Sequence, residues 1–268
     1  MTTNITKTKS IWHRPELSMR FLPVYLRNLL VWKKLAVSSV LGNIADPLIT
    51  LVAFGYGLGK LLPMVEGIPY IVYLAAGSLC MSTMMAASFE ALYSAFSRMH
   101  VQKTWESIMN APIELDDVLA AEWLWAATKS MFSAIAILVV MLVMGISREP
   151  TLILVVPVAV LVGLTFSALG LCFNAKAKGY DSFSYYFTLV LTPLIFISGV
   201  YYPMENLPGW LQIIASTLPL ASAVDLVRPA VIGQWPTNIV PKLLHLTAFA
   251  LTAFYIALVL TRQRFEKN

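Results

Sequence analysis

Long apolar stretches constrain the fold of this chain more than any other feature of its sequence. A transmembrane helix needs about 20 predominantly apolar residues to cross the ~30 Å hydrocarbon core of a membrane. Six stretches meet this requirement, at 41–62, 70–95, 118–145, 151–173, 183–203 and 241–261. Only 12% of the 268 residues are charged, whereas soluble domains carry about 25%. The sequence therefore predicts an all-α integral membrane protein with six transmembrane helices.

The segment 204–236 departs from the pattern of simple spans. It is too apolar for a solvent loop, yet its prolines exclude one continuous helix. These prolines are Pro208, Pro219, Pro229 and Pro236. Irregular backbone at membrane depth is tolerated only where protein or a water-filled cavity covers it. We therefore expect a re-entrant helical hairpin before the last span.

The distribution of basic residues predicts the orientation, because loops on the cytoplasmic side carry an excess of Lys and Arg. Fourteen of the 19 Lys and Arg residues fall on one side of a six-span chain, in 1–40, 98–103, 176–178 and 262–268. The other side has four, Lys60, Arg148, Arg228 and Lys242. We therefore expect a cytoplasmic N-terminal segment at 1–40, a membrane domain at 41–261 and a cytoplasmic tail at 262–268.

The segment 20–37 has the pattern of an amphipathic helix that lies in the membrane interface. At 100° per residue, the basic residues Arg20, Arg27 and Lys34 fall on one stripe. The opposite stripe is apolar and consists of Leu22, Tyr25, Leu26 and Leu29. Such a helix places its basic side against anionic headgroups, so we expect it at the inner surface of the membrane.

No catalytic or cofactor-binding pattern appears in the sequence. GYGLGK at 55–60 lacks the first glycine and the final Ser or Thr of a phosphate-binding loop, and the three histidines are scattered. The net charge of +5 is spread over short breaks and forms no stripe for nucleic acid. Cys80 and Cys172 lie inside apolar runs, which is typical of free thiols. We expect neither enzymatic activity, nor a bound cofactor or metal, nor nucleic acid as a partner.

Four charged residues fall inside the predicted spans, where an unpaired charge costs several kcal/mol. They are Asp46, Glu90, Glu122 and Lys129. The three acids lie near the cytoplasmic ends of their spans, so snorkelling to the interface explains them without a function. Lys129 is deeper and needs a partner, for which Glu90 is the candidate.

Two stretches together make the chain recognisable. The first is RMHVQKTWESIMNAPIELDDVLAAEW at 98–123, a basic break with a short helical segment and a proline stop. The second is LTPLIFISGVYYPMENLPGWLQIIASTLPLASAVDLVRPAVIG at 191–233, a span with an internal proline followed by a short apolar helix. The order and spacing of these parts resemble the ABC-2 family of permease subunits, which are the membrane halves of ATP-driven exporters.

Within that family the segment 12–49, WHRPELSMRFLPVYLRNLLVWKKLAVSSVLGNIADPLI, is most similar to the nodulation-protein J branch. That branch exports lipo-chitooligosaccharide signals, so the resemblance implies export of an acylated or lipid-linked oligosaccharide across a bacterial inner membrane. Two alternatives stay open. One is an ABC-2 exporter of a small hydrophobic drug or antibiotic, and the other is an ion-coupled carrier or membrane-embedded enzyme that acts alone.

The resemblance implies that a coupling helix at 104–112 docks on a separate ATPase, which holds ATP and Mg. By position it comprises Thr104, Trp105, Glu106, Met109, Asn110, Ala111 and Pro112. Trp105 and Met109 would anchor the contact, because large side chains carry much of an interface's energy. Without the resemblance, the same segment is an ordinary connecting helix with a solvated face.

Two aromatic clusters are candidates for a sugar pathway. The first, at the inner end of the fifth span, comprises Tyr180, Phe183, Tyr185, Tyr186 and Phe187. The second, at its outer end, comprises Phe196, Tyr201, Tyr202 and Trp210. Aromatic faces suit the C–H surfaces of sugars, but Tyr and Trp also concentrate at membrane interfaces for reasons unrelated to transport.

A single six-span chain encloses little, so we expect two copies to face each other across a pathway. Spans one and five are the expected seam, with Gly55 and Gly59 allowing close approach of the helices. The expected partners are a second copy of the chain, two ATPase subunits, membrane lipids and an amphiphilic oligosaccharide-type substrate.

Overall fold

The computed structural model describes residues 11–267, without the side chains of Val40, Asn43, Ile44, Asp46, Pro47 and Lys267. The first half of the chain forms α1 (Phe21–Lys33), α2 (Ala36–Thr50), η1 (Leu51–Tyr56), η2 (Leu58–Lys60), β1 (Met64–Val65), β2 (Ile68–Pro69), α3 (Tyr70–Phe89), η3 (Glu90–Ser94), η4 (Ser97–Val101), α4 (Thr104–Met109) and α5 (Leu115–Val143). The second half forms η5 (Pro150–Leu154), α6 (Val155–Lys176), α7 (Asp181–Tyr186), η6 (Phe187–Leu191), α8 (Thr192–Ile197), η7 (Met204–Asn206), α9 (Gly209–Ser216), α10 (Pro219–Val231) and α11 (Ile239–Lys267).

Four helices in the described part of the chain are long and apolar enough to cross a membrane. They are Tyr70–Val101, Leu115–Val143, Pro150–Lys176 and Ile239–Glu266. Each overlaps a predicted span, so four of the six predicted spans coincide with helices of suitable length and hydropathy. The predicted first and fifth spans contain the shorter apolar helices Leu48–Lys60 and Asp181–Ile197. The count of six spans therefore stays a prediction.

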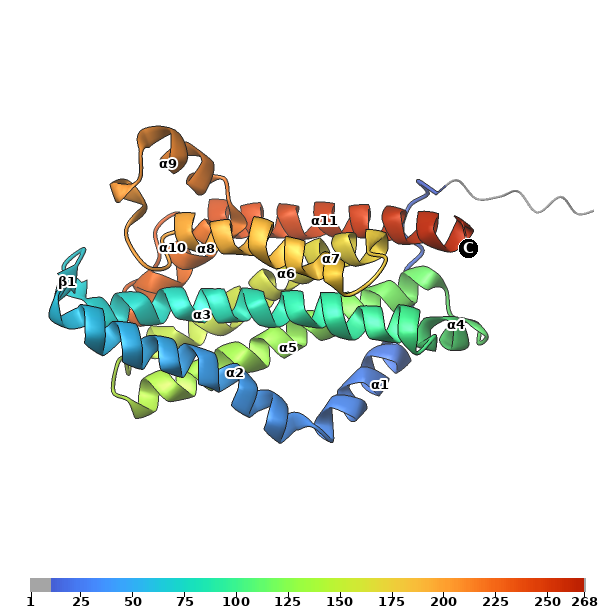
Figure 1. Cartoon of the computed structure of the whole chain (residues 1–268), viewed down its shortest axis with the longest axis horizontal. Coiled ribbons are helices and arrows are strands. Elements are labelled where there is room, and N and C mark those ends of the chain that lie inside the picture. The colour runs from blue at the N-terminus through green and yellow to red at the C-terminus, as the bar shows by residue number, and fades with distance from the viewer. Residues whose placement is uncertain (1–10, 268) are drawn as a thin grey trace, which may run out of the picture.

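The long helices run side by side and give the molecule two distinct ends (Figure 1). One end, the α4 end, has α4 and the C-terminal end of α11. The other, the hairpin end, has α9 and the two-stranded hairpin, in which Met64 pairs with Pro69 and Val65 with Ile68. Glu66 and Gly67 connect the strands with φ of 52° and 77°. Positive φ at both turn residues is the geometry of a type I′ turn, which is common in two-residue hairpins.

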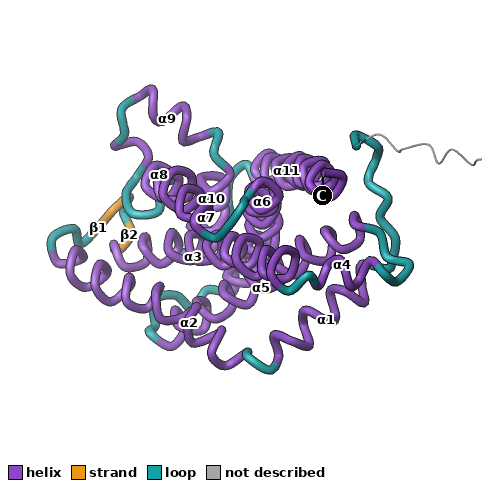
Figure 2. Tube along the Cα trace, turned by 45° about the vertical axis from the view of Figure 1, so that its right-hand side comes forward, coloured by secondary structure: helices purple, strands orange, loops and turns teal. Residues whose placement is uncertain are grey.

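The core of the bundle lies where α3, α5, α6 and α11 pack together, with α6 in the middle (Figure 2). Small residues permit close approach of these helices. A Cβ atom on Gly163 of α6 would lie 2.0 Å from Ser130 Oγ of α5. Between membrane helices, small residues at a contact let the backbones approach and gain van der Waals packing.

The helix Tyr70–Val101 contains two wide turns, η3 and η4, which are π-helical. Each π-turn accommodates one more residue than an α-turn, and such turns are frequent at functional sites. They lie on either side of Ala95 and Phe96, close to the α4 end. Glu90 begins the first wide turn and Arg98 lies in the second.

The predicted re-entrant segment is a bent pair of helices. α9 and α10 meet at an angle of 83°, and Pro219 is the first residue of α10. α9 extends away from the long helices at the hairpin end (Figure 1). The helix is interrupted near Pro219, as expected, because α9 ends at Ser216 and Pro219 begins α10. Pro229 is instead accommodated within α10, two residues before its end at Val231.

The predicted interfacial helix is shorter than 20–37 and ends at Lys33, followed by a turn into α2. Its bundle-facing residues are Val24 and Asn28, which are buried. Val24 belongs to the side of the helix that carries the basic stripe, so the side turned to the bundle is not the leucine stripe. Leu22 and Leu26 remain exposed and are free to contact lipid.

Gly77→Ala is expected to destabilise the protein by about 1–3 kcal/mol, because overpacking forces backbone shifts. A Cβ atom there would lie 2.3 Å from the carbonyl oxygen of Val200, which crosses α3 at this point. Gly209→Ala is the control, since its Cβ would meet no described atom within 4 Å. Denaturant unfolding in detergent micelles measures both variants, and equal effects would contradict the close contact at Gly77.

Candidate functional site

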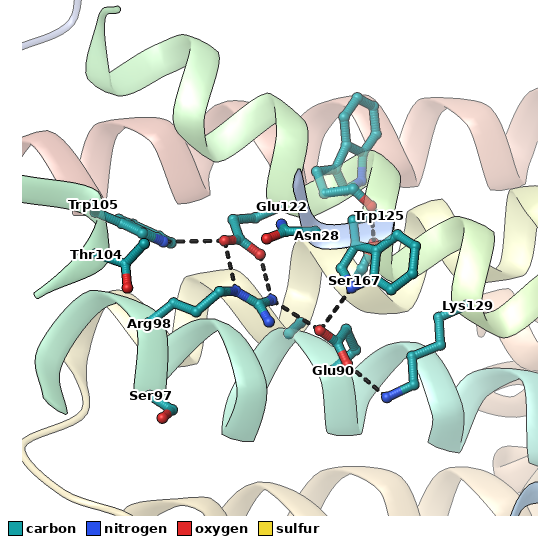
Figure 3. A network of polar contacts seen from close by, with 12 residues as sticks. Asn28, Glu90, Ser97, Arg98, Thr104, Trp105, Glu122, Trp125, Lys129 and Ser167 are labelled. Carbon is teal, nitrogen blue, oxygen red and sulfur yellow. Dashed lines mark hydrogen bonds and ion pairs between the residues drawn. The ribbon is translucent and has the colours of Figure 1, made fainter. Parts of the chain in front are cut away.

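A network of charged and aromatic side chains occupies the interior of the bundle near the α4 end (Figure 3). Glu90 and Arg98 belong to the wide turns of the α3 helix, and Glu122 and Lys129 belong to α5. The two carboxylates are only 3% and 2% exposed. The network therefore holds charged groups inside the bundle, where they require partners.

Arg98 is the centre of the network. Its Nε donates to Glu122 Oε1 at 2.8 Å, and its Nη2 donates to Glu122 Oε2 at 2.5 Å. The same Nη2 donates to Glu90 Oε1 at 2.8 Å, and Lys129 Nζ donates to Glu90 Oε2 at 2.7 Å. Two cations thus neutralise two carboxylates, which removes most of the penalty for burying them. The expected pairing of Lys129 with Glu90 is confirmed.

Two tryptophans extend the network to its surroundings. Trp125 Nε1 donates to Glu90 Oε1 at 2.9 Å. Trp105 Nε1 of α4 donates to Glu122 Oε1 at 3.1 Å, and its ring stacks on Phe265 of α11 with centroids 6.4 Å apart. The short helix α4 is therefore tied to α5, to the α3 helix through Arg98, and to α11.

This placement changes the role predicted for Trp105. The side chain is 1% exposed, so it cannot anchor a partner protein on the surface. Trp105 can be buried because its indole N–H donates a hydrogen bond to the buried carboxylate of Glu122. The residues of the predicted coupling helix that are exposed are Glu106, Asn110, Ala111 and Pro112, while Thr104 and Met109 are half-buried.

The predicted explanation of Glu90 and Glu122 as snorkelling side chains is wrong. Both turn inward and bind the cations and indoles of the network, because a buried pair with satisfied hydrogen bonds is available there. Asp46, the third acid expected inside a span, has a side chain outside the described residues.

A second set of polar contacts ties residues 11–20 to the α4 end. Arg262 of α11 forms a buried ion pair with Asp116 at the start of α5. Its Nη1 also donates to the carbonyl oxygens of Ile11 and His13 at 2.9 and 2.8 Å. One guanidinium thus joins the chain before α1, the first turn of α5 and the last turns of α11.

The same segment reaches the loop after α4. Ser18 Oγ donates to Asp117 Oδ2 at 2.8 Å, and Arg20 Nη1 donates to the Pro112 carbonyl oxygen at 2.6 Å. Asp116 and Asp117 lie in the first turn of α5, where the helix dipole favours negative charge. The loop at 110–114 is therefore connected to the start of α1.

A cavity of about 480 Å³ lies beside the network, between α1, the α3 helix, α5 and the start of α7. It is lined by Arg27, Asn28, Val31, Trp32, Leu35, Glu90, Tyr93, Ser94, Ser97, Arg98, Gln102, Trp125, Lys129 and Tyr180. Asn28 Nδ2 and Trp32 Nε1 are buried donors without an acceptor among the described residues. Donors and aromatic faces together suit a polar ligand rich in oxygen acceptors.

The inner aromatic cluster divides into two groups. Phe183 and Tyr186 are buried, and they pack on Phe96 and Phe173 with centroids 5.2 and 4.7 Å apart. Phe183 and Tyr186 were predicted to line a pathway. Their rings are instead packed in the hydrophobic core, so this prediction does not fit their burial. Tyr180 and Tyr185 are exposed and Phe187 is half-buried. Tyr180 also lines the 480 Å³ cavity.

The outer aromatic cluster does not form one site. The ring centroid of Tyr201 lies 5.6 Å from that of Phe196 and 6.1 Å from that of Phe54. Tyr202 is half-buried after the α8 turn, and Trp210 is exposed on α9. Phe196, Tyr201 and Phe54 therefore form a small patch at the hairpin end.

The two glycines expected at a seam between copies differ in their surroundings. A Cβ on Gly55 would lie 2.9 Å from Ile71 Cγ1, so this glycine serves a contact inside the chain. The contact with Ile71 explains why a glycine stands at position 55, and no second copy is needed for this explanation. A Cβ on Gly59 would meet no described atom within 4 Å, so Gly59 remains a candidate for a contact between two copies.

Arg98, Trp125 and Asn28 were not among the residues predicted for a site. A signal for the first two exists in the sequence. Glu122, Trp125 and Lys129 are spaced by three and four residues, which places them on one helix face. Opposite charges on two neighbouring predicted spans could have suggested a network. Asn28 carries no such signal, because its burial depends on how α1 packs on α5.

No group of three His, Cys, Asp or Glu side chains suited to a metal ion occurs within the described residues. Cys80 and Cys172 are free thiols, as expected. Within the described residues, the network contains no nucleophile activated by a neighbouring base. Its charged groups form ion pairs with one another.

Comparison with known proteins gives a family and several relatives. The family described as ABC-2 type transporter matches residues 21–232. Nodulation protein J of Rhizobium leguminosarum bv. viciae is 40% identical over 250 residues, which cover 93% of this chain and 96% of that protein. Nodulation protein J of Rhizobium meliloti (strain 1021) is 38% identical over 93% and 95% of the two chains. The inner membrane transport permease YadH of Escherichia coli (strain K12) is 25% identical over 80% and 84%.

Proposed function

Since this chain belongs to the ABC-2 type transporter family, we propose that it forms the membrane pathway of an ATP-driven exporter of an acylated or lipid-linked oligosaccharide. The observation that carries this proposal is the network that ties α4 to the membrane helices through Trp105, Glu122 and Arg98. A segment that receives force from a partner has to be connected rigidly to the helices that it moves. The buried ion pairs provide that connection.

The ATPase docks on the outward surface of α4 and the loop that follows. Glu106, Asn110, Ala111 and Pro112 are exposed there, with Met109 at the edge. Trp105 transmits the contact inward and is no part of the docking surface. ATP and Mg belong to the two ATPase subunits, so this chain carries no cofactor. The α4 end lies in the cytoplasm, as the distribution of Lys and Arg predicts.

The remaining spans and the assembly follow from the same proposal. α2 with Leu48–Lys60 is the first span and Asp181–Ile197 the fifth, and the bent pair α9–α10 is a re-entrant element. Both proposed spans expose large apolar side chains, including Val52, Phe54, Tyr185, Leu189 and Phe196. Two copies cover these surfaces by facing each other, with Gly59 as a close contact.

The substrate enters at the 480 Å³ cavity beside the network. Asn28 and Trp32 offer donors that have no acceptor among the described residues, and Arg27 offers positive charge to hydroxyl, carbonyl or phosphate oxygens. Tyr180 and Trp125 provide aromatic faces for sugar C–H surfaces. Several relatives are named Nodulation protein J. The resemblance to that branch implies an oligosaccharide, and this is the reason to propose it over a small hydrophobic drug.

Glu106→Arg is expected to reduce recovery of the ATPase in co-purification at least tenfold, because it reverses an exposed charge on the proposed docking surface. The chain would be expressed together with the ATPase subunit proposed as its partner, and the ATPase retained per chain would be measured. Glu205→Arg is the matched control, since it reverses an exposed charge at the hairpin end. Equal recovery with both variants would remove α4 as the docking segment.

The class of mechanism is tested with the wild-type chain in liposomes. ATP-dependent export of a fluorescent acylated oligosaccharide only when the ATPase is present supports the proposal. Transport driven by an ion gradient in the absence of the ATPase would overturn it in favour of a carrier that acts alone.

A further inference from the structure

A second cavity at the α4 end is separate from the proposed pathway. It has a volume of about 610 Å³ and lies between the loop after α6, the last turns of α11 and His100 at the end of the α3 helix. We propose that this cavity binds the headgroup of an anionic phospholipid from the surrounding leaflet.

The charge of the lining favours an anion. Lys176, Lys178, Arg264 and His100 line the cavity, and none of the acidic side chains that the structure describes does. Lys176 and Lys178 are exposed, and neither forms an ion pair with a carboxylate that the structure describes. Two unpaired lysines beside a fixed arginine attract a phosphate group and can donate hydrogen bonds to its oxygens.

Contacts with α6 and with Phe96 fix the position of the Arg264 side chain at the cavity. Its Nη1 donates to the carbonyl oxygens of Asn174 and Ala177 at 2.9 and 2.8 Å, which end α6. Its guanidinium carbon lies 5.7 Å from the centre of the Phe96 ring, and its Nη2 faces His100 Nδ1 at 3.5 Å. The guanidinium therefore neutralises the negative end of the α6 dipole and leaves the lysines free for a ligand.

The surroundings of the cavity favour a lipid over a soluble anion. Phe173 lies one turn before Lys176 on the same face of α6, and Ile256 lies one turn before Leu260 on α11. Both side chains are exposed, at 42% and 46%. Below the basic lining, the two helices thus continue as an apolar surface that suits acyl chains. Basic pockets between transmembrane helices on the cytoplasmic side are typical headgroup sites.

The location of the cavity keeps it open to lipid in the proposed assembly. α11 lies on the opposite side of the bundle from α2 in both views of the whole chain (Figures 1 and 2). A second copy that packs on α2 therefore leaves α11 facing the membrane. The lipid would bind the assembled transporter without entering its pathway.

The test is a titration of the full-length chain with phosphatidylglycerol and phosphatidylcholine, followed by native mass spectrometry. We expect phosphatidylglycerol to bind more tightly than phosphatidylcholine. The double variant Lys176→Gln/Lys178→Gln should weaken phosphatidylglycerol binding about thirtyfold, on the basis of about fivefold per lysine near an anionic surface. Lys176→Arg/Lys178→Arg should restore binding, which separates a lost site from a damaged fold.

Lys60→Gln/Arg148→Gln is the matched control, because it removes the same charge from two exposed positions that do not line the cavity. Equal weakening by this control would overturn the proposal, since the effect would then be one of overall charge. Equal affinity for the two lipids, or unchanged binding to the Lys176/Lys178 variant, would also overturn it. Displacement by inorganic phosphate at concentrations similar to those of the lipid would identify a site for a soluble anion instead.

Discussion

Arg98→Ala is expected to destabilise the protein by about 3–5 kcal/mol, because it removes one partner from a buried network of ion pairs. Glu122 loses both hydrogen bonds from the guanidinium and keeps only the Trp105 indole as a donor among the described residues. Glu90 keeps Lys129 and Trp125. The main penalty is therefore the uncompensated charge of Glu122. Denaturant unfolding in detergent micelles measures the loss.

A surface ion pair provides the control for this prediction. Lys103 and Glu106 pair at 3.0 Å with side chains 63% and 51% exposed. Lys103→Ala should change the stability by no more than about 1 kcal/mol, as exposed pairs do. Adding Glu122→Gln to Arg98→Ala should restore part of the lost stability, because it removes the unpaired charge. If the double variant were less stable than Arg98→Ala alone, the assignment of the penalty to Glu122 would be wrong.

Arg262→Ala is expected to cost about 3 kcal/mol and to release residues 11–20 from the bundle. It leaves Asp116 without its buried cation, a loss of the size found for broken buried pairs. It also removes the donors that hold the carbonyl oxygens of Ile11 and His13. Limited proteolysis should then cleave before α1 at a protease concentration that leaves the wild type intact, and unfolding should give the free-energy change.

Arg148→Ala is the comparison for Arg262, because Arg148 is exposed at the other end of the bundle. A surface substitution of this kind usually stays within about 0.5 kcal/mol. Protection of residues 11–20 in Arg262→Ala, with unchanged stability, would contradict this prediction and show that other contacts, such as those of Ser18 with Asp117 and Arg20 with Pro112, are enough to hold the segment.

The sequence predicts those parts of the fold that depend on length and hydropathy. Four of the six predicted spans coincide with long apolar helices, because about 20 apolar residues in a row have few other solutions. The break at Pro219 was predictable for an equally local reason, since proline lacks the N–H of a helix interior. Glu90 could be predicted as the partner of Lys129, because an unpaired charge inside a span is costly.

The direction in which side chains point could not be predicted in the same way. Trp105, Phe183 and Tyr186 were expected at surfaces or in a pathway and are buried. In a chain that is apolar on most faces, hydropathy does not distinguish a face turned to lipid from a face turned to another helix. The hydrogen bond from Trp105 to Glu122 joins residues 17 positions apart on separate helices, so it requires the tertiary arrangement.

The two wide turns of the Tyr70–Val101 helix have a consequence for how this chain aligns with its relatives. Each π-turn places one additional residue in the helix without changing the path of the backbone on either side. A relative with a regular α-helix here should therefore align with a one-residue gap inside a membrane span, near Glu90–Ser94 or Ser97–Val101. Without that gap, an alignment is out of phase by about 100° on one side of the π-turn, so it matches residues that lie on different faces of the helix.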